Sequence, residues 1–260
     1  MTLAPVPEPL DPERYRTASA HYEHGRVPYA PALIQRVAEA VDLRPQHRVL
    51  DLGCGPGPLA RRFAPLAREV VAMDPTPEML SAARALAGGI ANIRFVAGSS
   101  YDLGPGLGRF HLVVMGRSFH WMDRVDTLKR LDGLIEPAGA IALFADSAPA
   151  VPANAWRKTW QDICARYEPR NGAHRSDPNW IRHEAILLDS PFARLERFGV
   201  VERRALDVET LVERTLSMGS TSPSHLGEKG TAAIAADIRS ALGGLSEEVV
   251  ETSALVAWRP

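Results

Sequence analysis

The sequence predicts an α/β fold: a doubly wound, mostly parallel seven-stranded sheet with a helical cap. Three observations support this prediction. Between residues 48 and 145, short runs of strand-forming residues alternate with segments of helical spacing, the pattern of βαβ units. A loop with glycine at every second position connects the first strand to a helix. A proline-containing break at residues 148–152 then ends the alternation.

The composition narrows the class of protein. A chain of 260 residues with a formal net charge of -1 can hold one α/β domain with a cap, and it has no general attraction for nucleic acid or anionic membranes. Its two cysteines, Cys54 and Cys164, do not suggest a disulfide scaffold. No apolar run approaches the ~20 residues of a membrane span, and the amino terminus does not resemble an export signal. We expect a cytoplasmic monomer or homodimer with no nucleic-acid partner, no membrane partner and no metal.

The chain before the first strand divides into two parts. Closely spaced prolines predict a flexible arm at residues 1–14. Residues 15–146 are predicted to form the α/β core, which opens with amino-terminal helices. The helix before the first strand has one apolar face, formed by Leu33, Ile34, Val37, Ala38 and Val41.

The alternation then sets the core elements in order. Strand-forming runs with β-branched residues end at polar or glycine-containing turns, and helical segments show apolar residues three or four positions apart. The predicted strands are 48–51, 69–74, 93–97, 110–115 and 139–145, and the predicted helices are 58–67, 77–87 and 124–134.

The alternation ends after Asp146. Residues 147–192 predict a cap or lid, in which a helix at 153–167 is followed by loops and short helices at 168–190. Residues 193–260 are predicted to complete the sheet. Their elements are strands near 195–206 and 249–258 and helices at 208–217 and 229–242.

The loop after the first strand is the most informative segment. It reads Asp51-Leu-Gly-Cys-Gly-Pro-Gly57, and its glycines supply a turn without Cβ atoms, so a large ligand can lie directly on the backbone. Pro58 suits the first turn of the next helix, whose amino terminus faces the loop. The segment therefore predicts a nucleotide-like binding site.

Two other nucleotide-binding loops fit this spacing poorly. A dinucleotide-binding G-x-G-x-x-G loop that starts at Gly53 needs glycine or alanine where the chain has Pro58. A P-loop needs Gly-Lys-Ser/Thr after the glycines, which this segment lacks. A glycine turn without any ligand remains the structural alternative.

The glycine segment resembles the first motif of class I S-adenosylmethionine-dependent methyltransferases. The block Ser118-Phe-His-Trp121 resembles the variant found after the fourth strand in the methyltransferase type-11 group, whose members act on small molecules. The Asp/Asn-Pro-Pro-Tyr signature of DNA amino-methyltransferases is missing at this place. The resemblance spans about residues 15 to 145 and implies a Rossmann-like methyltransferase fold. It also implies S-adenosylmethionine as the cofactor and S-adenosylhomocysteine as the product.

Two polar residues follow the next strands. Asp74 ends the second strand, about 20 residues after the glycine loop, where a carboxylate can accept both hydrogens of a ribose diol. Asp74 could instead be the N-cap of the following helix. Ser99 stands where the family has an acid that accepts the adenine amino hydrogens; its hydroxyl could serve more weakly, or Asp102 or a backbone carbonyl could replace it.

The resemblance implies a set of cofactor-binding residues. Within it, the Arg26 guanidinium would hold the methionine carboxylate in a two-point contact, closed over by Tyr22 or Tyr29. A solvent-exposed helix residue is the alternative for Arg26. The expected cofactor-binding residues are Tyr22, Arg26, Asp51, Gly53, Cys54, Gly55, Gly57, Asp74, Pro75, Met79, Ser99, Ser100, Tyr101, Met115, Gly116, Phe119 and Trp121.

We therefore expect an S-adenosylmethionine-dependent methyltransferase (EC 2.1.1) that acts on a small-molecule acceptor by in-line displacement. His120 is the candidate for a base or a positioning group, because a neutral imidazole accepts a proton near pH 7. Packing within the pocket is its alternative role. A second hypothesis is a cofactor-binding but catalytically silent regulatory or assembly protein, and a nicotinamide oxidoreductase is disfavoured by Pro58.

Overall fold

The computed structural model describes residues 17, 19–167 and 180–260. The predicted arm at residues 1–14 and residues 168–179 of the predicted cap lie outside the described residues.

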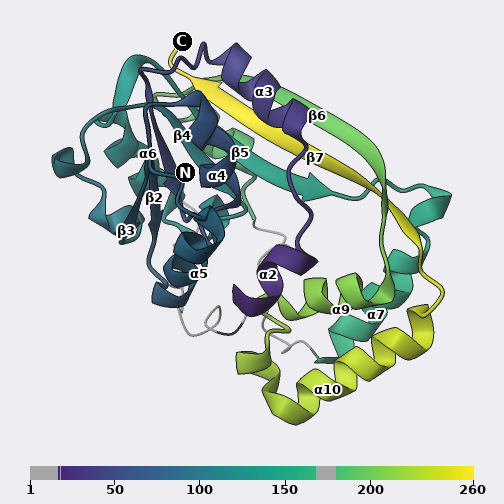
Figure 1. Ribbon diagram of the computed structural model, residues 1–260. Coiled ribbons are helices and arrows are strands. Elements are labelled where there is room, and N and C mark those ends of the chain that lie inside the picture. Colours follow the sequence, from purple (N-terminus) through teal and green to yellow (C-terminus); the bar gives the residue numbers. More distant parts are fainter. Residues whose placement is uncertain (1–16, 18, 168–179) are drawn as a thin grey trace.

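The described residues form one seven-stranded sheet (Figure 1). The strands are β1 (Arg48–Leu52), β2 (Glu69–Asp74), β3 (Ile93–Ala97), β4 (Phe110–Gly116), β5 (Ile135–Ser147), β6 (Arg194–Ala205) and β7 (Glu247–Trp258). Their order is β3-β2-β1-β4-β5-β7-β6, and only β7 runs antiparallel to its neighbours. The predicted doubly wound, mostly parallel sheet is confirmed. Because the chain reverses its direction of winding between β1 and β4, a ligand site is expected at the carboxyl ends of these strands.

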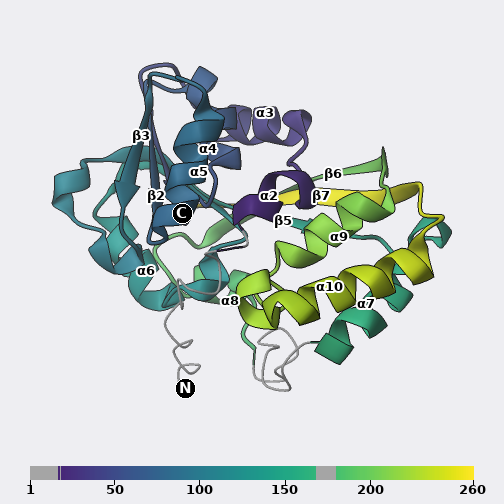
Figure 2. The ribbon, with the colours of Figure 1, turned by 60° about the horizontal axis from the view of Figure 1, so that its bottom comes forward.

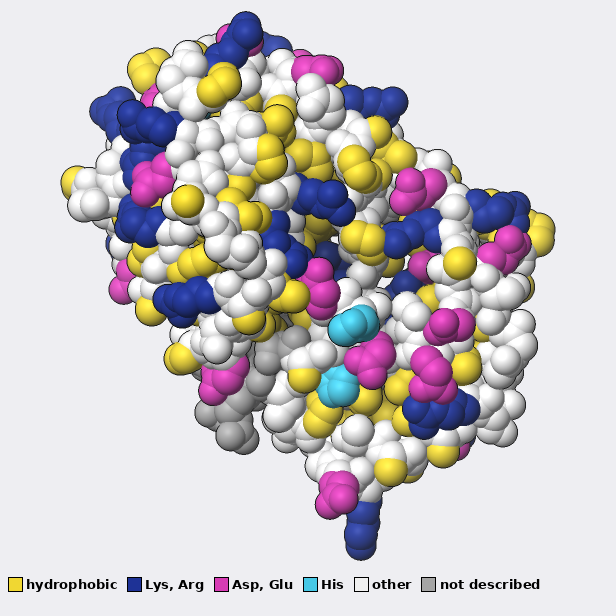
Figure 3. All heavy atoms as spheres, in the orientation of Figure 1, with side chains coloured by type: hydrophobic (Ala, Val, Ile, Leu, Met, Phe, Trp, Pro, Cys, Tyr) yellow, Lys and Arg dark blue, Asp and Glu magenta, His cyan; other side chains and the backbone are white. Residues whose placement is uncertain are grey.

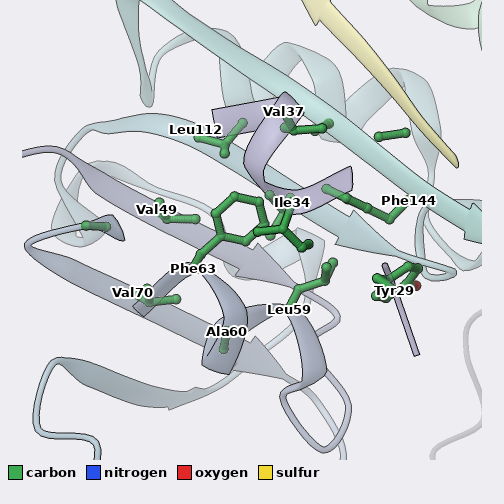
Figure 4. Packing of buried hydrophobic residues seen from close by; sticks show 14 of the residues in the cluster. Tyr29, Ile34, Val37, Val49, Leu59, Ala60, Phe63, Val70, Leu112 and Phe144 are labelled. Carbon is green, nitrogen blue, oxygen red and sulfur yellow. The ribbon is translucent and has the colours of Figure 1, made fainter. Parts of the chain in front are cut away.

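Helices cover both faces of the sheet. The helices of the described residues are α2 (Ser19–Gly25), α3 (Pro31–Ala40), α4 (Pro58–Phe63), α5 (Pro77–Ala87), α6 (Arg124–Asp132), α7 (Trp156–Tyr167), α8 (His183–Leu188), α9 (Val208–Leu216) and α10 (Pro223–Leu242). On one face, Ile34 and Val37 of α3 and Phe63 of α4 pack with strand residues such as Val49 and Leu112 (Figure 4).

The opposite face has its own core. Leu128 and Leu131 of α6 and Leu187 of α8 pack there with strand residues such as Leu50 and Val113. Since successive strand side chains point to opposite faces, each strand contributes to both cores. The central strands β1, β2 and β4 are thereby buried on both sides, as expected in a mostly parallel sheet, whereas the edge strand β6 is partly exposed.

A separate helical layer lies beside the carboxyl edge of the sheet (Figures 1 and 2). Its core joins Trp160 of α7, Leu211 of α9 and Ile234 of α10. In the sequence, α7 precedes β6, whereas α9 and α10 follow it. Two segments that are separate in the sequence therefore form one layer. Among the described residues, no helix has both the length and the apolar composition for crossing a membrane.

Three elements differ most from their predicted bounds. The predicted helix 58–67 ends as α4 at Phe63 and continues as a 3-10 turn, because Pro65 has no N–H to extend the α-helix. The predicted helix 229–242 is the longer part of α10, which begins at Pro223 and is interrupted at Gly227, where φ is +67°. β5 starts at Ile135, four positions before the predicted strand, and its pairing with β4 shifts register between Phe110 and Leu112.

A buried ion pair fixes α2 to the helical layer. Both terminal nitrogens of Arg214 donate to the carboxylate of Glu248 at 2.7 Å, and Nε donates to the carbonyl oxygen of Gly25 at 3.0 Å. A Cβ atom on Gly25 would lie 2.3 Å from the backbone nitrogen of Arg214, so α2 rests directly on α9. The helix that borders the glycine loop is thus held from the far side by α9 and β7.

Candidate functional site

The glycine loop lies at the carboxyl end of β1 in left-handed backbone. The φ angles of Gly53, Gly55 and Gly57 are +68°, +55° and +78°, which residues with a Cβ atom rarely adopt. A Cβ atom on Gly53 would lie 2.6 Å from Cβ of Ser118, whose hydroxyl donates to the carbonyl oxygen of Leu52 at 2.8 Å. A Cβ atom on Gly55 would meet nothing within 4 Å, so the loop is open to a ligand there.

Two buried carboxylates organise this loop. Asp51 accepts from the backbone N–H of Ala60 in the first turn of α4 at 2.9 Å. Asp74 accepts from Gly55 N–H at 2.8 Å with one oxygen and from Thr76 N–H at 2.9 Å with the other. Burial raises the pKa of Asp51 to about 7 and also raises the pKa of Asp74.

The alternative of Asp74 as a helix N-cap is wrong. Thr76 occupies the N-cap of α5, and Asp74 lies before it at the end of β2. Pro75 is partly buried between them, and Met79 is buried in the first turns of α5. Asp74 is therefore placed to face the loop as well as to fix the start of α5.

The turn after β3 is closed on itself. Ser99 donates its hydroxyl to Asp102 at 2.9 Å, and its backbone N–H donates to the same carboxylate oxygen at 2.8 Å. These bonds hold the pKa of Asp102 below its ordinary value. Ser100 is buried and Tyr101 is exposed, so the part of this turn open to a ligand comprises Ser99, Tyr101 and Asp102.

The turn after β4 divides its predicted site residues into two groups. The side chains of Met115 and Phe119 are buried in the core beneath α6, which leaves their backbone as the part able to contact a ligand. His120 and Trp121 are only partly buried, and their ring centroids lie 4.8 Å apart.

Cys54 of the glycine loop is buried in the core on the other face. Burial raises the pKa of its thiol well above the ordinary value.

A cleft of about 320 Å³ lies between α2 and the start of α4, where Pro58 follows the glycine loop. Its main lining residues are Tyr22, Arg26, Tyr29, Arg61, Arg62 and Arg117, and we call it the arginine cleft. Figure 3 shows basic side chains bordering a hollow on this side of the molecule. The structure thus brings the predicted residues Tyr22 and Arg26 to the edge of the loop.

Arg117 is one of the cleft residues that the sequence pattern does not single out, together with Arg61 and Arg62. It follows β4 with φ of +57°, and Nη1 donates to Asp146 at 2.6 Å and to the carbonyl oxygen of Val27 at 3.2 Å. Its guanidinium carbon lies 4.7 Å from the centroid of the Tyr29 ring. The available signal was an arginine at the end of an otherwise buried apolar strand.

A histidine cluster lies at the other edge of the sheet. The rings of His47 and His111 stack with centroids 3.7 Å apart, and Glu136 lies 3.2 Å from His111 Nδ1. His111 Nε2 lies 2.6 Å from the carbonyl oxygen of Val41, and His47 Nδ1 accepts from Arg44 N–H at 3.0 Å. Burial and the neighbouring His111 lower the pKa of His47. This cluster is near the amino ends of β1 and β4 and takes no part in the site at the glycine loop.

Comparison with known proteins indicates which family has both this fold and this glycine loop. Residues 49–139, which contain the glycine loop, Asp74 and the turn after β4, match a family model described as a methyltransferase domain. An uncharacterized methyltransferase of Mycobacterium tuberculosis is 26% identical over 217 residues, 83% of this chain and 81% of that protein. Residues 49–139 form a methyltransferase domain, and these matches support a class I S-adenosylmethionine-dependent methyltransferase. Its cofactor is S-adenosylmethionine, as the sequence predicts.

Two further similarities agree with this family. The methyltransferase shares its fold with a solved S-adenosylmethionine-dependent methyltransferase of Geobacter sulfurreducens in complex with S-adenosylhomocysteine. The TM-score is 0.55 and the identity 15%, with 97% of this chain and 99% of that chain covered. Trans-aconitate 2-methyltransferase of Streptomyces avermitilis is 33% identical over 139 residues, 51% of this chain and 49% of that protein. The predicted Rossmann-like methyltransferase fold is confirmed.

Proposed function

We propose that this methyltransferase acts on a small-molecule acceptor by in-line displacement. The observation that carries the proposal is the arginine cleft of about 320 Å³ at Pro58, the residue that follows the open glycine loop. A cleft of this size suits a small molecule better than a polymer. The partial similarity to a protein named for methylation of trans-aconitate supports the same class of acceptor.

The buried carboxylates fit the methyl donor. Asp74 would accept the two ribose hydroxyls, since each carboxylate oxygen has a second lone pair beyond its backbone bond. Asp51 would face the methionine ammonium across the loop, and Arg26 would bind the methionine carboxylate. The open surface at Gly55 and the unpartnered Nε of Arg26 fit a ligand at this place.

The remaining predicted residues would surround the donor. The turn at Ser99 and Tyr101 would border the adenine together with Met79. A Cβ atom on Gly116 would lie 2.8 Å from the Tyr29 hydroxyl oxygen, so this position has no room for a side chain, and its backbone would border the methionine end. His120 and Trp121 would form the wall towards the acceptor.

When bound, S-adenosylmethionine supplies a methyl group on a sulfonium, a leaving group that departs as a neutral thioether. The work of the protein is to align the acceptor atom with this methyl group and to exclude water. The aromatic wall at His120 and Trp121 would provide a surface of low polarity. His120 would accept a proton from an acceptor that loses one, or would hold it in position.

The proposal is tested by incubating the protein with S-adenosylmethionine and a metabolite library, and by following S-adenosylhomocysteine and methylated products by mass spectrometry. We expect a methylated small molecule to appear in proportion to S-adenosylhomocysteine. Donor binding without any conversion in the library would contradict the proposal and favour a catalytically silent protein.

Replacing His120 by glutamine is expected to lower kcat for the identified acceptor by about 100-fold or more, because a positioned base contributes at least this factor. Donor affinity should stay unchanged. The measurement is the pH profile of kcat and the dissociation constant of S-adenosylmethionine for both proteins. An unchanged rate with unchanged binding would show that the imidazole has no part in the reaction.

Donor affinity is expected to fall as pH is lowered below 7. The pKa of Asp51 is about 7 in the free protein, so below that pH the carboxyl group binds a proton. The methionine ammonium favours the ionised carboxylate, and binding must then release the proton, which weakens affinity by up to about tenfold per pH unit. Calorimetry in buffers of different ionisation enthalpy measures the protons released. Asp51→Asn should remove this pH dependence, and a pH dependence equal in both proteins would refute the assignment.

A further inference from the structure

The arginine cleft carries more positive than negative charge. Among the described residues, four arginines and one acidic residue, Glu23, line it. Glu23 binds Arg61 through both carboxylate oxygens, at 2.9 and 2.8 Å, and Arg117 is paired with Asp146. Among the described residues, no carboxylate forms a salt bridge with the two other arginines, Arg26 and Arg62.

The cleft also contains buried donors that lack a partner. The Tyr29 hydroxyl and the Nε atoms of Arg26 and Arg117 have no hydrogen bond within the described residues. Tyr29 is only 2% exposed, and its hydroxyl is close to Gly116 at the end of β4. Arginine nitrogens can only donate, so the complementary ligand must offer acceptor atoms. A buried donor without a partner is costly, which favours a ligand that satisfies it.

The position of Arg117 is fixed by the fold. Its backbone adopts φ of +57°, an uncommon conformation for a residue with a Cβ atom. Its side chain is held by Asp146, by the Val27 carbonyl and by the Tyr29 ring. A strained and immobilised residue beside a ligand site is characteristic of functional positions.

The methyl donor increases the excess positive charge. It brings a sulfonium and an ammonium against one carboxylate. Asp51 would face the ammonium and Arg26 would take the carboxylate, which leaves the charge of the sulfonium. Arg62 then remains without a matching anion, and Nε of the paired Arg117 remains without an acceptor. An acceptor with a negative charge would balance the site, and the field of the cleft would attract such a molecule.

We propose that the methyl acceptor is a small organic acid, whose carboxylate is bound in the arginine cleft by Arg117 and the Tyr29 hydroxyl. This inference rests on the proposed function and names the substrate class of the same site. Arg117 is then a specificity-determining residue, because a planar guanidinium matches the two oxygens of a carboxylate.

The test compares organic acids with their neutral amides. The compounds are a library of acids with matched amides, such as benzoate with benzamide and succinate with succinamide. Inorganic phosphate is tested as well. Binding is measured by calorimetry with S-adenosylhomocysteine present, and turnover by product mass spectrometry. We expect acids to bind and react about tenfold or more better than their amides. Binding or turnover confined to neutral compounds, to cationic compounds or to phosphate would overturn the proposal, as would a library in which no acid binds.

Variants separate the acceptor site from the donor site. The pair Arg117→Gln with Asp146→Asn removes both charges and leaves no unpaired buried ion, and its fold is checked by thermal unfolding. We expect KM for the acid to rise about tenfold or more while the dissociation constant of S-adenosylmethionine is unchanged. Arg239→Gln, at an exposed pair on α10, serves as the control. Weaker donor binding with an unchanged acceptor KM would assign Arg117 to the cofactor and overturn the proposal. If the wild-type protein did not bind S-adenosylmethionine, the proposed function itself would be refuted.

Discussion

Asp74→Ala is expected to weaken S-adenosylmethionine binding by about 100-fold or more, since each hydrogen bond to a charged group contributes roughly 1.5–3 kcal/mol. The change removes the acceptor for the ribose hydroxyls. It also leaves the buried N–H groups of Gly55 and Thr76 without their present partner. Isothermal titration calorimetry measures the effect directly.

Two variants show whether this loss is specific. Asp74→Asn keeps one acceptor oxygen and should give an intermediate affinity. Glu78→Ala removes an exposed acid from the first turn of the same helix α5 and should bind the donor as the wild type does. An Asp74→Ala protein that binds with undiminished affinity would remove Asp74 from the cofactor site.

Arg214→Ala is expected to lower the free energy of unfolding by about 3–5 kcal/mol, because it strands a buried carboxylate. Glu248 is 2% exposed and receives both of its charge-assisted bonds from Arg214. The third bond, to the Gly25 carbonyl, holds α2 against α9, so the wall of the arginine cleft should loosen as well. Urea-induced unfolding followed by circular dichroism measures the loss.

The control for this prediction is an exposed ion pair. Arg239 and Glu209 also form a two-point contact, but their side chains are 49% and 61% exposed. Arg239→Ala should cost less than about 1 kcal/mol. A loss in Arg214→Ala no larger than in this control would show that the buried pair does not hold α2 in place.

Local patterns predict the elements of the sheet well. The strands at 69–74 and 93–97 and the helix at 77–87 have the predicted bounds. Their periodicity and their end signals are contained in a few consecutive residues, such as Pro77 at the start of α5 and Gly88 after its end. The break in α10 at Gly227 and the early start of β5 depend on backbone geometry and on strand pairing, which such patterns describe poorly.

The donor side of the site is also visible in the sequence. The glycine loop and Asp74 lie near each other because parallel neighbouring strands end at the same edge, which the alternation of elements already implies. The side chains of Met115 and Phe119 both lie in the core beneath α6. The local sequence pattern does not predict that these two side chains point away from the ligand site.

The acceptor side depends on contacts between distant segments. Arg117 is held in place by contacts with Asp146, Val27 and Tyr29. Asp146 lies near the end of β5, and the other two residues lie between α2 and α3. The helical layer over this edge likewise joins α7 to α9 and α10. Local periodicity does not predict contacts between distant segments. The sequence therefore predicts the binding site of the methyl donor but not that of the acceptor.

A crystal structure of the protein with S-adenosylhomocysteine tests the assignment of the donor site most directly. We expect both ribose hydroxyls within hydrogen-bond distance of Asp74 and the homocysteine part over the backbone of Gly53 to Gly57. Its carboxylate should contact Arg26, while Arg117 remains paired with Asp146 and faces the empty part of the arginine cleft. A ligand whose ribose lies away from Asp74, or whose carboxylate occupies Arg117, would contradict the proposed division between donor and acceptor.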